Sequence, residues 1–364
     1  HPWWEATREH VLAGRLPLIA DTIGGGLPLL ANGQTGVFAP VMLPVWVLGP
    51  ERGTTVMALW KIEVAGIGAF LFLLRMWRVR WAAAAVGALA YAGGAYQVAW
   101  LLVPLSWLTA ALPWLWWLTA AAMGRRANWR HVVGLGLVCG WLLGGGLHPE
   151  TAAVAIGSAF MCGLILHPRR WLRVAASAAL MVVVAAALAW PTVVYIGASS
   201  RLHVVHDQRP NQRPVPEGWR GLAARQLLLP AVNGHPGRGD WRAPFPHAPA
   251  ATGVGGVALA LLAAGSVRRR FRGLLWAALA CLGVAAVLYL RIPPLDWPLV
   301  RVPPLDRMTL PRFAALVPWG LAMCAALSLD GALSGRLRSV GWRWVPAAIL
   351  ALVALFGEPL GLAG

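Results

Sequence analysis

The sequence predicts an all-α membrane protein: a polytopic bundle of about ten transmembrane helices with irregular extracytoplasmic loops. Of the 364 residues, 59% are hydrophobic and 12% are charged, and the mean hydropathy is +0.63. A soluble domain is roughly 45–50% apolar and about 25% charged. Apolar stretches of the length that crosses a bilayer, ~20 residues, recur along the chain. Arginine clusters lie between many of these stretches, as they do in multi-pass membrane proteins.

The net charge of +18 comes mostly from five arginine clusters between apolar stretches. The clusters are Arg75, Arg78 and Arg80; Arg125, Arg126 and Arg130; Arg169, Arg170 and Arg173; Arg268, Arg269, Arg270 and Arg272; and Arg336, Arg338 and Arg343. An excess of arginine is typical of cytoplasmic loops. We therefore assign the clusters to the cytoplasmic side, and this topology argues against a nucleic-acid-binding surface.

Residues 1–53 are expected to form a first extracytoplasmic loop with segments on the membrane surface. Its segment Leu16–Pro44 is apolar but cannot form one helix, because prolines remove backbone donors and glycines allow positive φ. Asn32 and Gln34 would present amide groups there; the alternative is a connector without chemistry. Because the chain begins with His1, we expect one further helix upstream of it.

The remaining chain divides into a first helix set at 54–196, an extracytoplasmic loop at 197–251 and a second helix set at 252–364. Ten apolar stretches are the expected spans. They are Thr54–Trp77, Trp81–Leu102, Leu105–Met123, His131–Leu147, Thr151–Leu166, Leu172–Ile196, Thr252–Val267, Leu274–Leu290, Pro311–Leu329 and Trp344–Phe356. With the arginine clusters inside, every other connection falls on the outer side, where the kinked and polar segments gather.

Lys61 and Glu63 lie within the first expected span, where charges are expensive and face a cavity or a partner. Two residues apart, they do not share a helix face, so each is expected to pair elsewhere. They would suit the polar pathway of a transporter; the alternative is structural pairing or a lysine that reaches the interface.

His148, Pro149 and Glu150 follow three glycines at the outer end of an expected span. Pro149 suits the first turn of the next helix, and its N-terminus favours the Glu150 carboxylate. This is either an acidic helix start or a His148 and Glu150 pair that lines an outer pocket. His203 and His206 could share a helix face, but without a third ligand we assign no metal residues.

The last outer loop repeats a short motif: Arg291–Asp296 recurs as Arg301–Asp306, and Arg307 and Arg312 follow. Arginines at a helix start oppose the helix dipole, so an anionic group nearby would explain them. The forked guanidinium suits a phosphate. The alternative is that these arginines contact lipid headgroups.

These motifs resemble those of the bacterial YfhO-type membrane protein family, which is itself similar to the GT-C glycosyltransferase superfamily. The matching stretches are Pro2-Trp3-Trp4, Leu16-Pro17-Leu18, Gly25-Gly26 with Pro28, Ala31–Gln34 with Pro40, Gly146–Thr151, the late Arg-x-Pro-Pro, Asp306–Phe313, and Leu329-Asp330. The resemblance implies a GT-C-like protein of the bacterial inner (cytoplasmic) membrane. Its activity would transfer a sugar from a polyprenyl-phosphate donor to a cell-envelope acceptor on the extracytoplasmic side.

The resemblance also implies roles for particular residues. The family's aspartate base would precede the Pro-Trp pair, upstream of His1, and its Asn-Pro is replaced here by Ala20-Asp21. We therefore consider Glu150, His148 and Asp21 as catalytic candidates. The expected donor-binding residues are Asn32, Gln34, Arg301, Arg307 and Arg312. Arginines would offset the leaving phosphate charge, with Mg²⁺ or Mn²⁺ as a possible cofactor.

Two other functions fit the same sequence. One is a transporter or flippase of lipid-linked saccharides, although no inverted repeat is visible. The other is a non-catalytic subunit of an envelope assembly, because the family's aspartate is missing from the chain.

Overall fold

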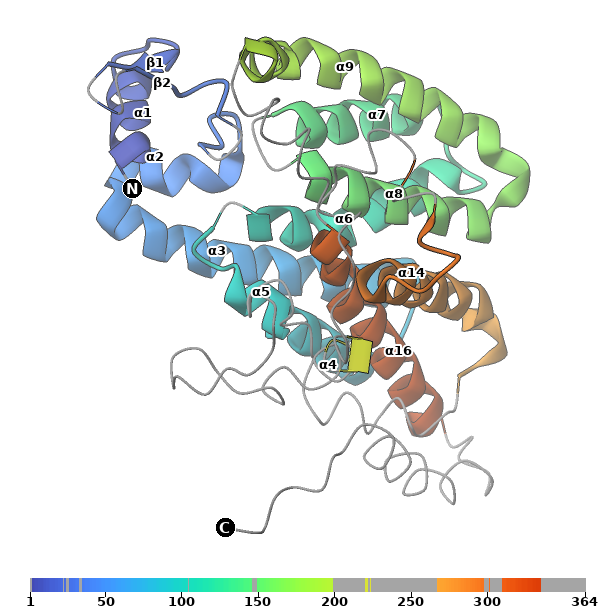
Figure 1. The fold of residues 1–364 in the computed structure, drawn as a ribbon. Helices are drawn as coiled ribbons and strands as arrows, with labels where there is room; N and C mark the ends of the chain where they lie inside the picture. The colour runs from blue at the N-terminus through green and yellow to red at the C-terminus, as the bar shows by residue number, and fades with distance from the viewer. Residues whose placement is uncertain are drawn as a thin grey trace. The chain divides into compact units, whose positions relative to one another are not determined.

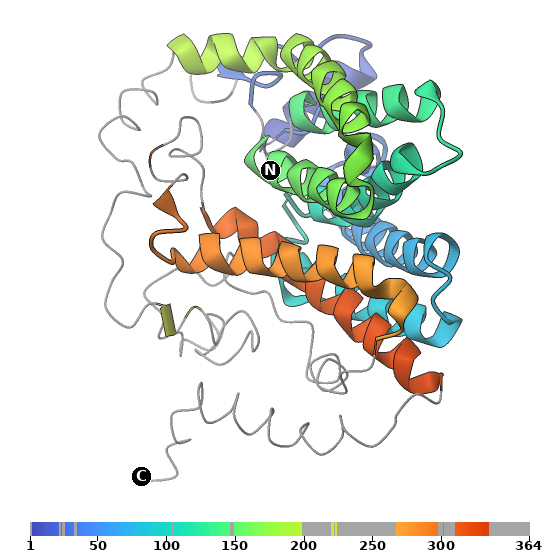
Figure 2. The same cartoon turned by 90° about the vertical axis from the view of Figure 1, so that its right-hand side faces the viewer.

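The computed structural model describes residues 2–21, 23, 26–32, 35–103, 105–145, 149–198, 220–221, 223, 267–297, 301 and 310–334. In these residues the chain is helical, with one small two-stranded sheet. The expected spans Thr252–Val267 and Trp344–Phe356 lie outside this part of the chain, apart from Val267. Figures 1 and 2 show the helices in two views. The all-α prediction is confirmed.

Five helical segments in the described residues are long and apolar enough to cross a membrane, which makes the chain a membrane protein by length and composition. They are Pro50–Met76, Pro149–Leu166, Pro168–Tyr195, Arg269–Leu290 and Arg312–Leu333. Each coincides with an expected span. The count of about ten spans stays a prediction.

The contacts divide the chain into two compact units, each assembled from separate stretches of sequence. Unit 1 comprises His1–Gly68, Trp100–Arg213 and Pro298–Arg312, and unit 2 comprises Ala69–Ala99, Pro214–Trp297 and Phe313–Gly364. The expected division at residues 53, 196 and 251 stays a prediction.

Unit 1 begins with a small folded segment of short helices and a hairpin. Helix α1 (Pro2–Leu12) packs on α2 (Leu43–Leu48), which follows the 3-10 turn η1 (Pro40–Met42). Strands β1 (Ile19–Ala20) and β2 (Leu27–Pro28) pair antiparallel, with Ile19 opposite Pro28. The prolines and glycines that exclude one long helix thus permit short turns and a hairpin.

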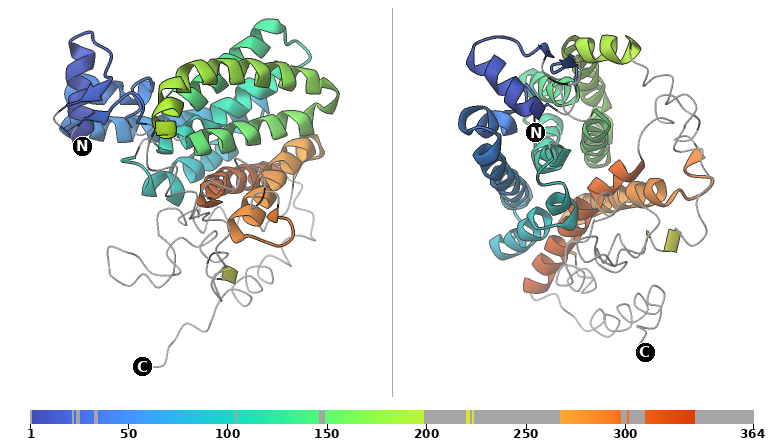
Figure 3. Two further views of the ribbon diagram at one scale, coloured as in Figure 1. Left: turned by 45° about the horizontal axis from the view of Figure 1, so that its top comes forward. Right: turned by 60° about the vertical axis from the view of Figure 1, so that its left-hand side comes forward.

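The core of unit 1 is a bundle of four apolar helices. They are α6 (Leu105–Met123), α7 (Trp129–Gly144), α8 (Pro149–Leu166) and α9 (Trp171–Ala198), and η3 (Pro168–Arg170) precedes the last of them. Helix α6 packs on α8, and α7 packs on α9 (Figure 3). The long α3 (Pro50–Leu71) begins in unit 1 and continues into unit 2 through the π-turn η2 (Phe72–Met76).

Helices α7 and α9 approach closely because glycine recurs at every fourth position of α7, at Gly136, Gly140 and Gly144. A Cβ on Gly140 would lie 2.6 Å from the Cβ of Val184 on α9. Small residues at this spacing let membrane helices pack backbone to backbone. The opposite side of α9 exposes Val182, Val183 and Trp190, as a lipid-facing surface would.

In unit 2, α16 (Leu316–Leu333) packs against both α4 (Trp81–Ala92) and α14 (Arg272–Leu290) and is buried along nearly its whole length. The 3-10 turns η8 (Leu310–Ala315) and η6 (Arg269–Phe271) lead into α16 and α14. The buried Trp319 contacts Tyr91 edge-on, with ring centroids 5.0 Å apart. Such contacts fix α16 as the central helix.

The expected span Trp81–Leu102 is wrong as a single helix. The chain breaks at Gly93 and Gly94 between α4 and the short α5 (Ala95–Ala99). Glycine pairs are frequent points of helix interruption. A Cβ on Gly94 would lie 3.2 Å from the Cβ of Pro318, so packing within unit 2 also favours glycine there.

Candidate functional site

The structure brings together two of the predicted site residues, Glu150 and Arg312. The Nε atom of Arg312 lies 3.8 Å from Oε2 of Glu150, and both residues belong to unit 1. The Glu150 side chain is 33% exposed and that of Arg312 is 17% exposed. The pair is thus half-buried, and solvent or a ligand can reach the carboxylate.

Glu150 owes its position to the start of α8. Pro149 is the first residue of that helix, and Glu150 lies in the first turn. Proline is pre-organised for this place, and the N-terminal end of the helix stabilises a negative charge. The acidic helix start is therefore confirmed, whereas the alternative of a His148 and Glu150 pair depends on His148, which lies outside the described residues.

Arg312 is held from its other side by an aromatic ring. Its guanidinium carbon lies 5.2 Å from the centre of the Trp100 ring, a distance suited to a cation–π interaction. Its Nε atom is buried and has no hydrogen-bond partner among the described residues, since 3.8 Å is too long for a hydrogen bond. Arg312 thus retains hydrogen-bonding capacity while its charge is partly balanced by Glu150.

Lys61 fixes the turn that carries Trp100. This side chain is fully buried, and its Nζ donates to the carbonyl oxygens of Leu101 at 2.9 Å and Val103 at 2.8 Å. Lysine in this place donates to two carbonyl groups between α5 and α6, of which that of Val103 also accepts hydrogen bonds from Ser106. The expectation that Lys61 pairs elsewhere than with Glu63 is confirmed, and its bonds make it a structural anchor and not the lining of an open pathway. Glu63 is exposed.

The arginine clusters of unit 1 lie at the opposite end of its helices from Glu150. Arg170 donates to the carbonyls of Met123 and Gly124, and Arg173 donates to that of Ala122, at the end of α6. Arginine is well placed there, because the last carbonyls of a helix lack intrahelical partners. Glu150 begins α8 and the Trp100 turn precedes α6, so the candidate site lies at the other end of the same helices.

The other predicted site residues are not brought into this pair by any contact described. Asp21 is exposed after β1, and Arg301 is exposed. Asn32 lies in a turn where its carbonyl accepts a hydrogen bond from the buried Thr35 hydroxyl at 2.9 Å. Gln34, His148 and Arg307 lie outside the described residues, as do His203 and His206.

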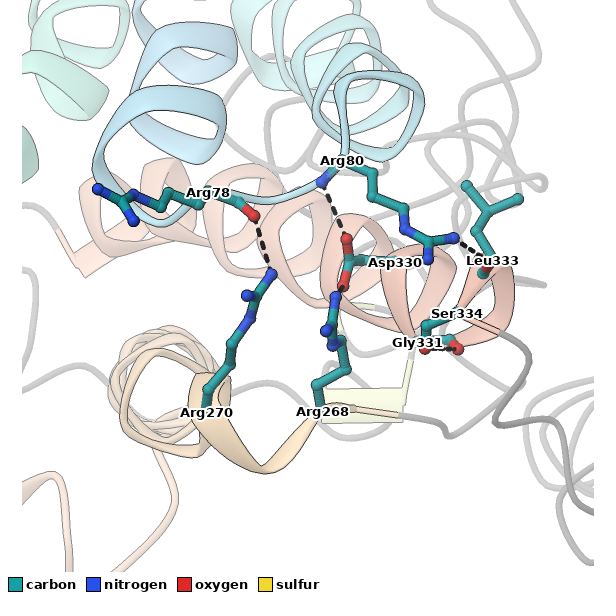
Figure 4. A network of polar contacts seen from close by, with 8 residues as sticks. All are labelled: Arg78, Arg80, Arg268, Arg270, Asp330, Gly331, Leu333 and Ser334. Atoms are coloured by element: carbon teal, nitrogen blue, oxygen red, sulfur yellow. Dashed lines mark hydrogen bonds and ion pairs between the residues drawn. The ribbon is translucent and has the colours of Figure 1, made fainter.

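A second carboxylate, Asp330 of unit 2, has a different environment (Figure 4). It is fully buried, its Oδ1 accepts the backbone N–H of Arg80 at 2.9 Å, and its Oδ2 lies 3.4 Å from the Arg268 guanidinium. Both oxygens are therefore satisfied within the protein. The first arginine repeat of the same unit also closes on itself, with Arg291 3.8 Å from Asp296.

The described residues do not fit a divalent metal at the candidate site. No group of three or more His, Cys, Asp or Glu side chains gathers anywhere in the described part of the chain. At Glu150 the nearest described charge is the Arg312 guanidinium, which would repel a cation. We therefore derive no catalytic step through a metal.

Sequence reasoning had selected Glu150 and Arg312 separately, from a helix start and from an arginine-rich loop. Nothing in the sequence marks Trp100, because its place beside Arg312 depends on the turn that Lys61 holds in the folded chain. Comparison of the chain with protein-family models, with curated proteins and with solved structures finds no match.

Proposed function

We propose that this protein is a membrane glycosyltransferase that transfers a sugar from a polyprenyl-phosphate donor to a cell-envelope acceptor on the extracytoplasmic side of the bacterial inner membrane. The observation that carries the proposal is the pair of Glu150 and Arg312 above the Trp100 ring. The resemblance of the motifs to the YfhO-type and GT-C-like proteins supports the choice of donor and acceptor.

Arg312 would bind the phosphate of the donor. A guanidinium forms bidentate, charge-assisted hydrogen bonds with phosphate oxygens, and here it has an unused Nε donor. Since the residue precedes the membrane helix α16 and follows a loop that the sequence predicts to face outward, it would lie where a lipid-linked phosphate meets the protein. Arg301 and Arg307 are proposed to contribute to the same phosphate.

Glu150 would act on the acceptor. In an inverting displacement the acceptor oxygen forms a bond to the anomeric carbon while the bond to the phosphate oxygen breaks. The acceptor proton passes to a general base, and the electron pair leaves with the phosphate. Glu150 is a half-buried carboxylate 3.8 Å from Arg312, the proposed phosphate ligand, and Arg312 would stabilise the developing phosphate charge.

The proposal is tested with the purified protein in lipid nanodiscs, a polyprenyl-phosphate sugar and a cell-envelope extract that supplies the acceptor, by following release of polyprenyl phosphate. Glu150→Gln and Arg312→Gln should each reduce release by roughly 100-fold or more, as general-base or charge-stabilising groups do. Glu5→Gln is the matched control, because Glu5 forms a similar exposed pair with Arg8 on α1.

Unchanged release in both variants would refute the proposal. In proteoliposomes, movement of the donor from one leaflet to the other without release of polyprenyl phosphate would instead favour the transporter or flippase. The Lys61 environment does not favour that alternative, since the amine is buried against two carbonyl oxygens.

A further inference from the structure

Unit 2 gathers two arginine clusters at one end of its helices. Seven arginines from two distant stretches lie here: Arg75, Arg78, Arg80, Arg268, Arg269, Arg270 and Arg272. Hydrogen bonds join the stretches, since the Arg270 guanidinium donates to the carbonyl of Arg78 at 2.9 Å. Asp330 is the only carboxylate among the described residues at this end, so the surface carries a large positive charge.

Three of these arginines are used by the fold (Figure 4). Arg268 pairs with Asp330, Arg270 holds the turn at Arg78, and Arg80 donates to the carbonyl of Leu333 at the end of α16. Each contact fixes one helix end against another. The network therefore gives the basic surface a defined shape.

The other four arginines take no part in these contacts. Arg75, Arg78, Arg269 and Arg272 are exposed, and no hydrogen bond or ion pair engages their guanidinium groups within the described residues. In Figure 4 the Arg78 side chain extends away from the Asp330 network. The N-terminal ends of α4 and α14 lie at the same place, and both add partial positive charge.

Two exposed tryptophans near this surface indicate how deep it lies in the membrane. Trp81 is the first residue of α4 and is 72% exposed, and Trp276 on the second turn of α14 is 63% exposed. Exposed tryptophans at the ends of apolar helices are typical of the lipid headgroup region. The free arginines are thus placed at the level of phospholipid phosphates.

We propose that Arg78, Arg269 and Arg272, with Arg75 beside them, form a binding site for the phosphate of an anionic phospholipid in the leaflet that the arginine loops face. Basic groups next to membrane helices attract acidic lipids, and guanidinium forks match phosphate oxygens. The buried Asp330 has a different role: it connects the two arginine stretches and, because it is buried, does not repel a phosphate at the surface. This site is separate from the proposed sugar-transfer site, and neither depends on the other.

The test uses native mass spectrometry of the full chain released from nanodiscs of mixed phosphatidylcholine and phosphatidylglycerol. The wild-type protein should retain phosphatidylglycerol in preference to phosphatidylcholine. The triple variant Arg78→Gln, Arg269→Gln, Arg272→Gln should bind it on the order of 100-fold more weakly, given the contribution of each arginine near an acidic membrane.

The matched control is Arg125→Gln, Arg126→Gln, Arg130→Gln, which removes the same charge from exposed positions of unit 1. This control variant should retain most of the phosphatidylglycerol binding. Equal loss in both triple variants, or no loss in the unit 2 variant, would overturn the site. Thermal unfolding in neutral detergent verifies that both variants fold. If inorganic phosphate alone raises the unfolding temperature as much as phosphatidylglycerol does, that result would also overturn the lipid site, in favour of a free-phosphate site.

Discussion

Two acid and arginine pairs of this protein differ in what surrounds the carboxylate. Asp330 is fully buried, lies 3.4 Å from Arg268 and also accepts a backbone N–H. Glu150 is one-third exposed, lies 3.8 Å from Arg312 and faces a guanidinium whose Nε has no hydrogen-bond partner among the described residues. The first pair has its hydrogen-bonding capacity used within the fold, and the second retains capacity for a ligand.

The difference explains why similar residue types have different roles. A buried charge is tolerated only when it is paired and hydrogen-bonded, and removing one partner leaves the other exposed to the full cost of desolvation. A partly hydrated pair contributes little to stability. We therefore expect Asp330 to matter for folding and Glu150 to matter for chemistry.

The largest effect is expected for Asp330→Ala. Loss of the carboxylate leaves the Arg268 charge and the Arg80 N–H without their partner. The variant should therefore lose about 3 kcal/mol of unfolding free energy. This value is near the low end for buried pairs because Arg268 is partly exposed. Denaturant or thermal unfolding in detergent measures it. A loss below ~1 kcal/mol would remove the distinction between the two carboxylates.

Lys61→Met should have the next largest effect. Methionine fills a similar volume but removes the lysine donor from the carbonyls of Leu101 and Val103, of which only that of Val103 keeps its bonds from Ser106, at a cost of about 1–3 kcal/mol. Because the turn also carries Trp100 beneath Arg312, the variant should weaken donor binding as well. Wild-type donor affinity in a destabilised variant would show that the turn does not position Arg312.

Glu150→Gln should leave stability nearly unchanged, by less than ~1 kcal/mol, because a half-exposed ion pair is weak. Its effect should appear in sugar transfer instead. Unfolding and transfer measured on one preparation separate the two. A stability loss equal to that of Asp330→Ala would make Glu150 a structural carboxylate and would contradict the comparison.

The smallest effect is a pH dependence at the arginine end of unit 1. The pKa of His167 is held below its usual value, first by burial and then by the positive charges of Arg170, Arg125 and Arg173. The unfolded state therefore binds more protons between the lowered pKa and about 6.5, so stability should fall as the pH falls through this window. His167→Gln should flatten this part of the pH profile; an unchanged slope would assign it to other groups.

The sequence determined the helices and the grouping of charge. Hydropathy depends on local composition, so the five membrane-length helices coincide with expected spans, while Trp81–Leu102, among the spans that the structure describes, is wrong at the glycine pair. The four-residue glycine spacing of α7 is a further signal in the sequence, and it indicates close helix packing. Turn chemistry in the opening segment was likewise readable as irregular structure, but the hairpin register was not.

Only the tertiary structure decided which charged residues meet. Glu150 and Arg312 were selected for separate local reasons, and nothing in either stretch specifies that the two contact each other over Trp100. The same holds for Lys61 and the carbonyls it binds, and for Asp330 and the two arginine stretches around it. Membrane insertion of a segment is set by its own apolar length, whereas a contact between distant segments depends on how all the helices pack, which no local window of sequence contains.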